Sequence, residues 1–439
     1  MKSKKVLLFF KGHVAAFLLF LILTCPLKVF AIWESPDGSM DIGGSFRSIA
    51  GVFDHTRLPE FYSQGKKKDY PVQTIFRFTS EGRPSENISF EVHIVQSNDF
   101  SIVDESGNIY TSQSSSRYRA IDVTLDWHKD NENYARLWLD RFNIKYSFPV
   151  ADLTIGRQAI TFGKAYFWNP MDIFKPFEPG QLDRDYKPGV DGFMLDISLG
   201  DFSGAALIGV LGPEVNIISG FTGKDNTWNS SLYGSALLSR FYTNISEWDF
   251  SFQAGKVYGG YHVSCGAIGE IGFLESRIEA AYFKSEKDTP VFFQSPGNLS
   301  EDYLAGVIGI GRTFPNTFVF ELEYFFNGAG DPDNLELSML RSVHGMSLNM
   351  SDQLLGLMLS YEIMPVFIAR FGLIYSVSDH SSQVLPSFFL SLSDEADLIV
   401  SATINYGKNP YLYQGSIPRM GSEFGSFPDI MLIEFKYYF

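Results

Sequence analysis

The sequence predicts an all-β protein, a transmembrane antiparallel β-barrel of about 16–18 strands with short turns at one end and long loops at the other. Apolar and polar residues alternate with period two along most of the chain, which is typical of strands that have one apolar and one polar face. Short and long connections between these segments also alternate. The last eleven residues form a strand-like segment that ends in an aromatic residue.

The composition agrees with a barrel whose apolar residues are spread out along the chain. Of the 439 residues, 45 % are hydrophobic and 16 % aromatic, with 41 Phe, 22 Tyr and 39 Gly, yet the mean hydropathy is only −0.02. After residue 31, no apolar run approaches the length of a membrane-spanning helix. A chain of this kind that crosses a bilayer must therefore cross it as a closed barrel, because only helices and closed barrels satisfy the backbone in lipid.

The N-terminus is predicted to be a signal peptide, residues 1–31. It begins with basic residues at Lys2, Lys4 and Lys5 and continues with ten apolar residues, Val14–Leu23, which is too short to span a bilayer. We expect cleavage after Ala31. The remainder, 32–439, is predicted to be a single barrel domain, in which 32–71 is either periplasmic or the first strand.

The charge balance argues against nucleic acid as a partner. The chain has 35 basic and 50 acidic residues, and the segment 1–31 contains five of the basic residues and none of the acidic ones. The mature chain would therefore carry 30 basic against 50 acidic residues, a net charge of −20.

The two cysteines bear on lipidation and on disulfides. Cys25 leaves open a lipidated N-terminus, although Thr24 fits poorly before a lipidated Cys. Cys265 would be the single Cys of the mature chain, which excludes an intramolecular disulfide.

The strand prediction rests on segments in which apolar residues occupy every second position. The clearest are Ile88–Ile94, Ile121–Trp127, Phe142–Tyr146, Phe193–Leu199, Trp248–Ala254, Phe318–Tyr324 and Leu398–Tyr406. Met40–Phe53 is also a possible strand, but its alternation is poor. Period two is the signal of a strand whose faces differ in polarity.

The connections predict which end of the barrel faces which side. The short ones are Gly200–Ser203, Thr243–Glu247, Phe314–Thr317, Met364–Pro365 and Asp394–Asp397, and the long ones are 163–189, 211–230, 285–302, 327–352 and 408–428. If Phe439 ends at the periplasm, every one of these long connections lies outside and every short one inside, as in outer-membrane barrels. The rule fails early, because it puts the long segment 98–119 on the periplasmic side. The number of predicted strands is nineteen, whereas bacterial barrels have even numbers of strands. Either Met40–Phe53 is not a strand of the barrel, or the segments before residue 130 must be divided differently.

The final segment, Asp429–Phe439, places Met431, Ile433, Phe435, Tyr437 and Phe439 on one face and mostly polar residues on the other. About ten residues is the length of a tilted strand that crosses a bilayer. The segment resembles the C-terminal strand of Gram-negative outer-membrane barrels. That resemblance implies that Phe439, Tyr437 and Phe435 form an assembly signal read by the barrel-assembly machinery. A buried edge strand of a soluble β protein is the alternative.

The most distinctive stretch is Leu153–Leu199, which contains Gly156-Arg157-Gln158, an Asn169-Pro170-Met171-Asp172 loop and a return strand that opens with Gly189-Val190-Asp191-Gly192. It is similar to a family of large porin-like barrels that includes alginate-export-type and related outer-membrane proteins. Glu323–Gly330 resembles another segment of these proteins. The resemblance implies an outer-membrane channel. A barrel of 16–18 strands normally encloses an aqueous lumen.

The Pro- and aromatic-rich connection 163–189 is predicted to fold inward and narrow this lumen. Charged side chains on it and on neighbouring strands are the candidates for lining the pore or its constriction: Arg157, Lys164, Asp172, Lys175, Arg184, Asp185, Asp191, Glu321 and Glu323. Charged rings set ion preference in pores. The alternative is that these charges fix the loop to the wall through ion pairs. Because acidic and basic residues are mixed in the predicted lumen, we expect a weakly cation-preferring or unselective pore.

The predicted function is a porin-like channel for passive diffusion of small solutes or ions, and not an enzyme, since no catalytic constellation is recognisable. The alternative is a barrel that serves as scaffold or sheath in an export or electron-conduit complex. The His residues have no metal-like spacing, and Asp331, Asp333 and Asn334 read more readily as a turn than as a Ca²⁺ site, so neither metal nor cofactor is expected. Expected partners are outer-membrane lipid, the barrel-assembly machinery and small solutes or ions, and a homo-oligomer is left open.

Overall fold

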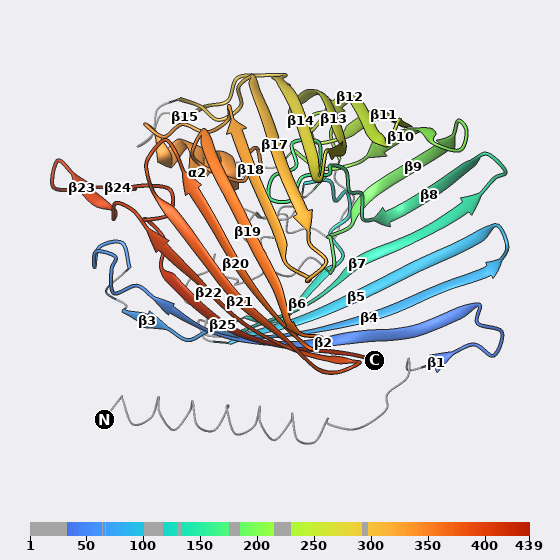
Figure 1. Ribbon diagram of the computed structural model, residues 1–439, viewed down its shortest axis with the longest axis horizontal. Helices are drawn as coiled ribbons and strands as arrows, with labels where there is room; N and C mark the ends of the chain where they lie inside the picture. The colour runs from blue at the N-terminus through green and yellow to red at the C-terminus, as the bar shows by residue number, and fades with distance from the viewer. Residues whose placement is uncertain are drawn as a thin grey trace.

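The computed structural model describes residues 33–63, 65, 67–100, 117–129, 133–174, 185–214, 230–291, 297–343 and 345–439. Within these residues, eighteen antiparallel strands close into one barrel (Figure 1). In order around the wall they are β2 (Met40–Asp54), β4 (Val72–Ser85), β5 (Ile88–Phe100), β7 (Asn133–Ser147), β8 (Ala151–Gln158), β9 (Val190–Ser198), β10 (Ser203–Val210), β11 (Ala236–Ile245), β12 (Trp248–Val257), β13 (Gly260–Ile271), β14 (Leu274–Ser285), β17 (Tyr303–Thr313), β18 (Val319–Asn327), β19 (Gln353–Met364), β20 (Phe367–Ser376), β21 (Ser382–Ser393), β22 (Ala396–Tyr406) and β25 (Asp429–Tyr438). The predicted fold class, an all-β barrel of 16–18 strands, is confirmed.

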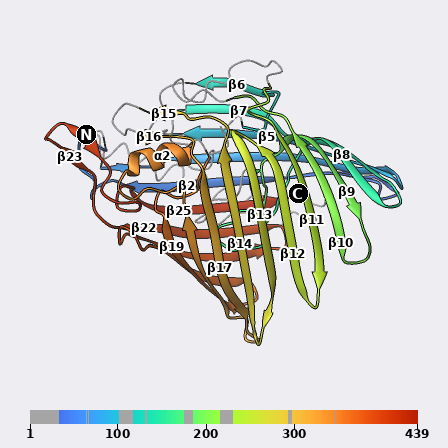
Figure 2. The ribbon, with the colours of Figure 1, turned by 90° about the horizontal axis from the view of Figure 1, so that it is seen from above.

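The remaining elements are short and belong to the connections. They are β1 (Trp33–Glu34), β3 (Lys68–Asp69), β6 (Thr124–Lys129), the pair β15 (Pro290–Val291) and β16 (Gly297–Asn298), the pair β23 (Tyr411–Tyr413) and β24 (Ile417–Arg419), and the helix α2 (Leu335–Val343). Figure 2 shows α2, β15 and β16 together at one end of the barrel. No helix among the described residues is long and apolar enough to span a bilayer.

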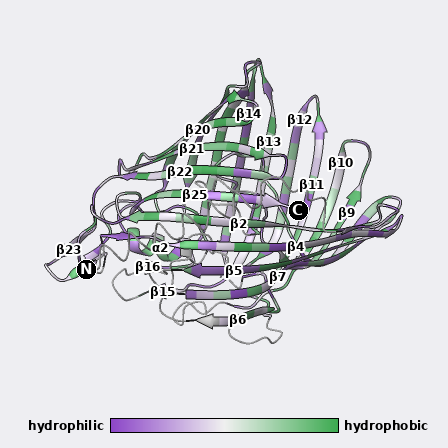
Figure 3. Ribbon diagram, turned by 90° about the horizontal axis from the view of Figure 1, so that it is seen from below, coloured by the Kyte–Doolittle hydropathy of each residue, from purple (hydrophilic) through white to green (hydrophobic). Residues whose placement is uncertain are grey.

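Alternation of side chains gives the wall two unlike faces. On β7, Phe142 and Ile144 are more than half exposed on the outside, whereas Asn143 between them is buried and turned to the interior. The same change from hydrophobic to hydrophilic residues runs along the other strands (Figure 3). An outer apolar band and a polar interior are what a barrel needs in order to cross a membrane around an aqueous lumen.

The long and short connections named from the sequence separate to opposite ends of the barrel. The strands that flank the long connections 159–189, 211–235, 286–302, 328–352 and 407–428 meet them at one end of the barrel, and the turns 199–202, 246–247, 314–318, 365–366 and 394–395 lie at the other. Two short turns, 258–259 and 377–381, lie at the same end of the barrel as the long connections. The orientation inferred from the second half of the sequence is therefore self-consistent.

Of the two alternatives left open for the early segments, a different division is the one that the structure has. Met40–Asp54 is a strand of the wall, so dropping it would be wrong. The turn after β4 is only two residues, 86–87, and β5 therefore ends at Phe100 at the same end of the barrel at which β8 ends before the connection 159–189. The segment 98–119 therefore begins at the end opposite the short turns and not on the periplasmic side, and its residues 101–116 lie outside the described part of the chain. Ile121–Trp127 contributes to β6, which pairs with β7 but is not one of the eighteen strands.

The barrel closes where β2 pairs with β25, from Ser45 opposite Tyr438 to Asp54 opposite Asp429. Phe435, Tyr437 and Phe439 form an aromatic cluster on the outer face with Phe46 and Phe76. Their role as an assembly signal stays a prediction. The backbone of Phe439 exchanges two hydrogen bonds with Gly44, at 2.7 and 3.0 Å. A Cβ at Gly44 would press against the carbonyl oxygen of Arg77 and lie 3.0 Å from the Phe439 ring.

We therefore expect Gly44→Ala to lower the thermal stability of the folded barrel in detergent, because overpacking of this kind costs about 1–3 kcal/mol. Gly306→Ala on β17 is the matched control, since the nearest atom to its added Cβ is 3.4 Å away. The temperature at which each variant loses the gel mobility of the folded barrel measures its thermal stability. Equal melting of the two variants would contradict the close packing at Gly44.

Candidate functional site

The connection between β8 and β9 enters the barrel, and its first part lies on the inner wall. This part, residues 160–174, is called the outgoing limb. Glu279 on β14 accepts hydrogen bonds from the backbone N–H groups of Lys164, Ala165 (3.3 Å) and Met171 (3.4 Å). Glu323 on β18 accepts from the N–H groups of Tyr166 (2.5 Å) and Phe167 (2.8 Å). Two inward carboxylates thus bind the backbone of the limb.

Aromatic packing holds the same limb against the wall. Trp168 is fully buried and stacks on Phe325 of β18, with ring centroids 5.2 Å apart and planes 8° from parallel. Its indole Nε1 donates to Asn349 Oδ1 at 2.7 Å. Gly356 on β19 leaves the space for these rings, because a Cβ there would lie 2.6 Å from Phe167 and 2.9 Å from Trp168. The apolar part of the interior therefore lies between this limb and the wall.

The end of the connection, residues 185–189, is called the return limb and reaches the opposite wall. Asp185 Oδ2 accepts hydrogen bonds from Arg47 on β2 (2.8 Å) and from Lys436 (3.0 Å) and the Tyr438 hydroxyl (2.7 Å) on β25. The outgoing limb also contacts β13, where Met171 packs beside Gly266, and β13 lies halfway around the eighteen-strand barrel from β2. The described parts of the connection therefore contact opposite sides of the lumen.

Tyr186 extends this contact to two further strands. The guanidinium of Arg77 on β4 lies 4.1 Å from the centre of the Tyr186 ring, and that of Arg47 lies 5.7 Å from it. The ring also meets His93 of β5 edge-on at 5.9 Å. Because Tyr186 is half-buried, its ring occupies lumen space beside a cluster of cations.

A buried ion pair joins the two limbs. Lys187 Nζ lies 2.6 Å from both carboxylate oxygens of Asp172, and each side chain is 4 % exposed. Burial raises the pKa of Asp172 to about 6, and the Lys187 ammonium opposes that shift. Burial also lowers the pKa of Lys187, against the attraction of Asp172. Removing either partner would leave a buried charge alone, so the pair fixes the return limb to the outgoing limb.

Arg157 and Asp191 also pair with each other, at the point where the connection leaves and re-enters the wall. The Nε and Nη2 atoms of Arg157 lie 2.6 and 2.9 Å from the two oxygens of Asp191. The same guanidinium donates to the carbonyl oxygens of Leu139 (2.7 Å) and Ile121. This arrangement joins the ends of β8 and β9 to the connection before β7.

The remaining candidates differ in their exposure. Lys164 is 47 % exposed and lies 3.5 Å from Asp249 of β12. Glu321 pairs with Arg277, which also lies 2.8 Å from Glu275 and 3.4 Å from Glu323. The hydroxyl of Tyr438 and the charges of Lys436 and Arg47 hold the pKa of Asp185 below its ordinary value, although burial opposes this. Lys175 and Arg184 lie outside the described residues.

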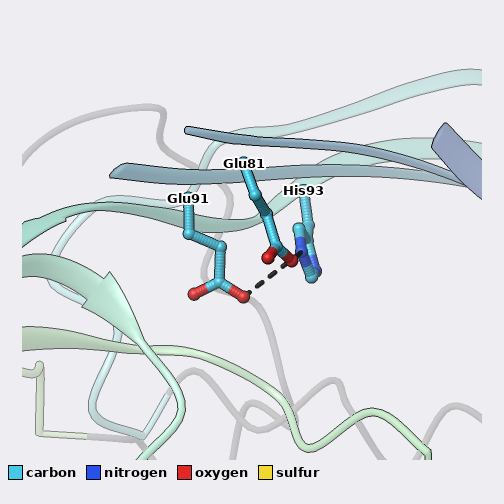
Figure 4. Close-up of side chains that lie close together, drawn as sticks. All are labelled: Glu81, Glu91 and His93. Carbon is cyan, nitrogen blue, oxygen red and sulfur yellow. Dashed lines mark hydrogen bonds and ion pairs between the residues drawn. The ribbon is translucent and has the colours of Figure 1, made fainter. Parts of the chain in front are cut away.

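Glu81, Glu91 and His93 form a cluster that sequence reasoning did not find (Figure 4). His93 Nε2 lies 3.2 Å from Glu91 Oε1 and 3.4 Å from Glu81 Oε1. On its other side, Nδ1 lies 3.3 Å from the Arg77 guanidinium, which can only donate. Nδ1 therefore accepts, and the ring hydrogen belongs on Nε2, directed at the carboxylates. A metal at Nε2 would need that lone pair, so the geometry favours a hydrogen-bonded cluster over a metal centre.

The sequence also missed residues that hold or line the connection. Glu279 has the inward phase of β14, shared with Arg277, and alternation alone was enough to place it there. Arg47 was not predicted because its segment alternates poorly. Tyr186 was not predicted because only charged residues were considered as candidates for the pore. Cross-strand contacts of this kind join residues more than a hundred positions apart and leave no local signal.

The fold has counterparts among solved structures. OccAB1 of Acinetobacter baumannii is 12 % identical, with 93 % of this chain and 98 % of that chain covered and a TM-score of 0.55. OccD3 (OpdP) of Pseudomonas aeruginosa is 8 % identical, with 91 % of each chain covered and a TM-score of 0.51. OccAB2 of A. baumannii is 11 % identical, with 92 % and 98 % covered and a TM-score of 0.51. The chain has the fold of an outer-membrane porin.

At these identities the likeness concerns the fold alone. No family model and no curated protein matches the sequence. The likeness covers the closed wall, and the residues that line the lumen must be argued from this chain itself.

We expect Glu323→Ala to release the outgoing limb, because two buried N–H groups lose their acceptor and each unsatisfied group costs about 1–3 kcal/mol. Hydrogen exchange of residues 164–171 should accelerate by about tenfold or more. Glu275→Ala is the control, since Glu275 also contacts Arg277 but is 49 % exposed. If the limb exchanges at the same rate in both variants, Glu323 does not anchor it.

Proposed function

We propose that the protein is an outer-membrane channel through which small solutes or ions diffuse passively, along a lumen that its own β8–β9 connection narrows. The observation that carries this proposal is the contact of that connection with opposite walls of a closed eighteen-strand barrel. Barrels of 16–18 strands are wide enough for an aqueous channel. An inward connection then sets the width of the passage.

The two faces of the wall support a membrane location. Large apolar side chains such as Phe142, Ile155, Leu237 and Ile308 are about half exposed or more on the outer face. In water such a surface would be far larger than the patches that monomeric soluble proteins expose. The outer membrane of a Gram-negative bacterium is the place for a barrel of this kind, and it implies the signal peptide 1–31 and recognition of Phe435, Tyr437 and Phe439 by the barrel-assembly machinery. A homo-oligomer is compatible with this proposal.

The candidate residues divide into two groups within this function. Asp172, Asp191, Arg157 and Glu323 are bound to partners and hold the connection in place. Lys164 and Asp185 keep more contact with the interior space and are the ones we assign to the pore lining, together with Tyr186, whereas Glu321 is 13 % exposed and pairs with Arg277. Because both signs of charge are present, a weak ion preference is the expected result.

The scaffold or sheath function is less well supported. A partner threaded through the barrel would need the inner wall for its contacts. The outgoing limb already covers β12, β14 and β18 on that wall, through Gln253, Glu279 and Glu323. This arrangement suits a channel with a constriction of its own.

Refolded mature protein in a planar bilayer should give stable ohmic conductance steps, because the passage needs no partner. Under a salt gradient the reversal potential should be small and of cationic sign, as mixed lumen charges predict. A protein that inserts as a folded barrel and never conducts would overturn the channel proposal.

The Tyr186 ring is expected to limit the passage, so Tyr186→Ala should raise single-channel conductance. Tyr324→Ala is the matched control, because Tyr324 lies between the inward residues Glu323 and Phe325 on β18 and faces the lipid. Both variants should fold, since neither ring is fully buried. Unchanged conductance in Tyr186→Ala would place the narrowest point elsewhere.

A further inference from the structure

The seam, where β2 pairs with β25 and closes the barrel, contains an unfavourable pair of like charges. Across the β2–β25 ladder, Arg47 stands directly opposite Lys436. Both side chains face the lumen, and they are only 11 % and 6 % exposed. Like charges directly opposite each other destabilise a strand pair, and limited contact with water screens them little. A carboxylate close to both cations would therefore stabilise the seam.

The return limb supplies it. Asp185 Oδ2 lies 2.8 Å from Arg47 Nη2 on one strand of the seam and 3.0 Å from Lys436 Nζ on the other, and it also accepts from the Tyr438 hydroxyl at 2.7 Å. One carboxylate oxygen thus receives hydrogen bonds from both strands. Charge-assisted hydrogen bonds of this kind are the strong ones.

Other carboxylates near the seam are placed differently. Glu434 on β25 lies 4.0 Å from Arg47 Nη1. Asp397 stands opposite Lys436 on the other side of β25 and accepts a hydrogen bond from Ser391 at 2.9 Å. Among the described residues, Asp185 is the carboxylate with an oxygen within 3.0 Å of both cations.

We propose that Asp185 is a latch for the closing seam, so that docking of the β8–β9 connection and pairing of β2 with β25 stabilise each other. The far wall holds the return limb in place, since Lys187 binds Asp172 and the outgoing limb binds Glu279 and Glu323. The connection then has a structural role that does not depend on conduction.

Hydrogen exchange of the full refolded barrel in detergent tests the latch. In Asp185→Asn, amides of β2 and β25 should exchange about tenfold faster than in the wild type, the effect of losing one charge-assisted hydrogen bond, whereas β13 and β14 should not change. Asp249→Asn is the matched control, because it removes another ion pair between the connection and the wall, with Lys164, far from the seam. It should leave β2 and β25 protected.

A second substitution distinguishes neutralisation of the two cations from a general destabilisation of the barrel. Lys436→Met removes one of the opposed cations, so the Asp185→Asn change should have a smaller effect on the seam in a Lys436→Met background. The latch is overturned if β2 and β25 keep their protection in Asp185→Asn, if β13 and β14 accelerate equally, or if Lys436→Met does not reduce the effect. Should Asp185→Asn fail to fold, folding of the double variant supports the latch and failure of both overturns it.

Discussion

A connection that enters a barrel must find partners for its backbone N–H groups, and this requirement shapes the interior. Within the wall, the backbone N–H groups of each strand are bonded to the neighbouring strands. Residues 160–174 are not part of a strand, and their backbone N–H groups lie in the lumen. Glu279 and Glu323 accept five hydrogen bonds from them. Burial of these carboxylates is costly unless they are bonded in this way. The limb and the two acids therefore depend on each other, and the position of the return limb follows from both.

The fold was largely predictable because membrane strands obey local rules. Alternation gave most strands, and the parity of connections gave their direction. The early segments failed for a physical reason: Ile121–Trp127 alternates like a wall strand because β6 pairs along β7 without becoming one of the eighteen strands. Met40–Asp54 shows the reverse, since the glycines at 43, 44 and 51 make room for neighbours and dilute its alternation.

The site was less predictable because the role of a charge depends on what it meets. The sequence could show that Asp172 and Glu323 are charged and near a distinctive loop, but whether they face solutes or hold the loop depends on Lys187 and on the amides of Tyr166 and Phe167. Both possibilities were open from the residues. The structure places both carboxylates among such partners, whereas Asp185 and Lys164 remain 38 % and 47 % exposed.

This distribution separates the net charge of the chain from the field inside the lumen. The full chain carries −15 at pH 7, yet inward acids such as Glu91, Asp140 and Glu321 face Arg141, Arg77 and Arg277 at ion-pair distance. Paired charges contribute mainly short-range dipoles to a passing ion. The few side chains that keep contact with the passage, among them Glu81 at 62 % exposure, then decide the ion preference. A strongly acidic chain can in this way enclose a lumen of nearly balanced charge.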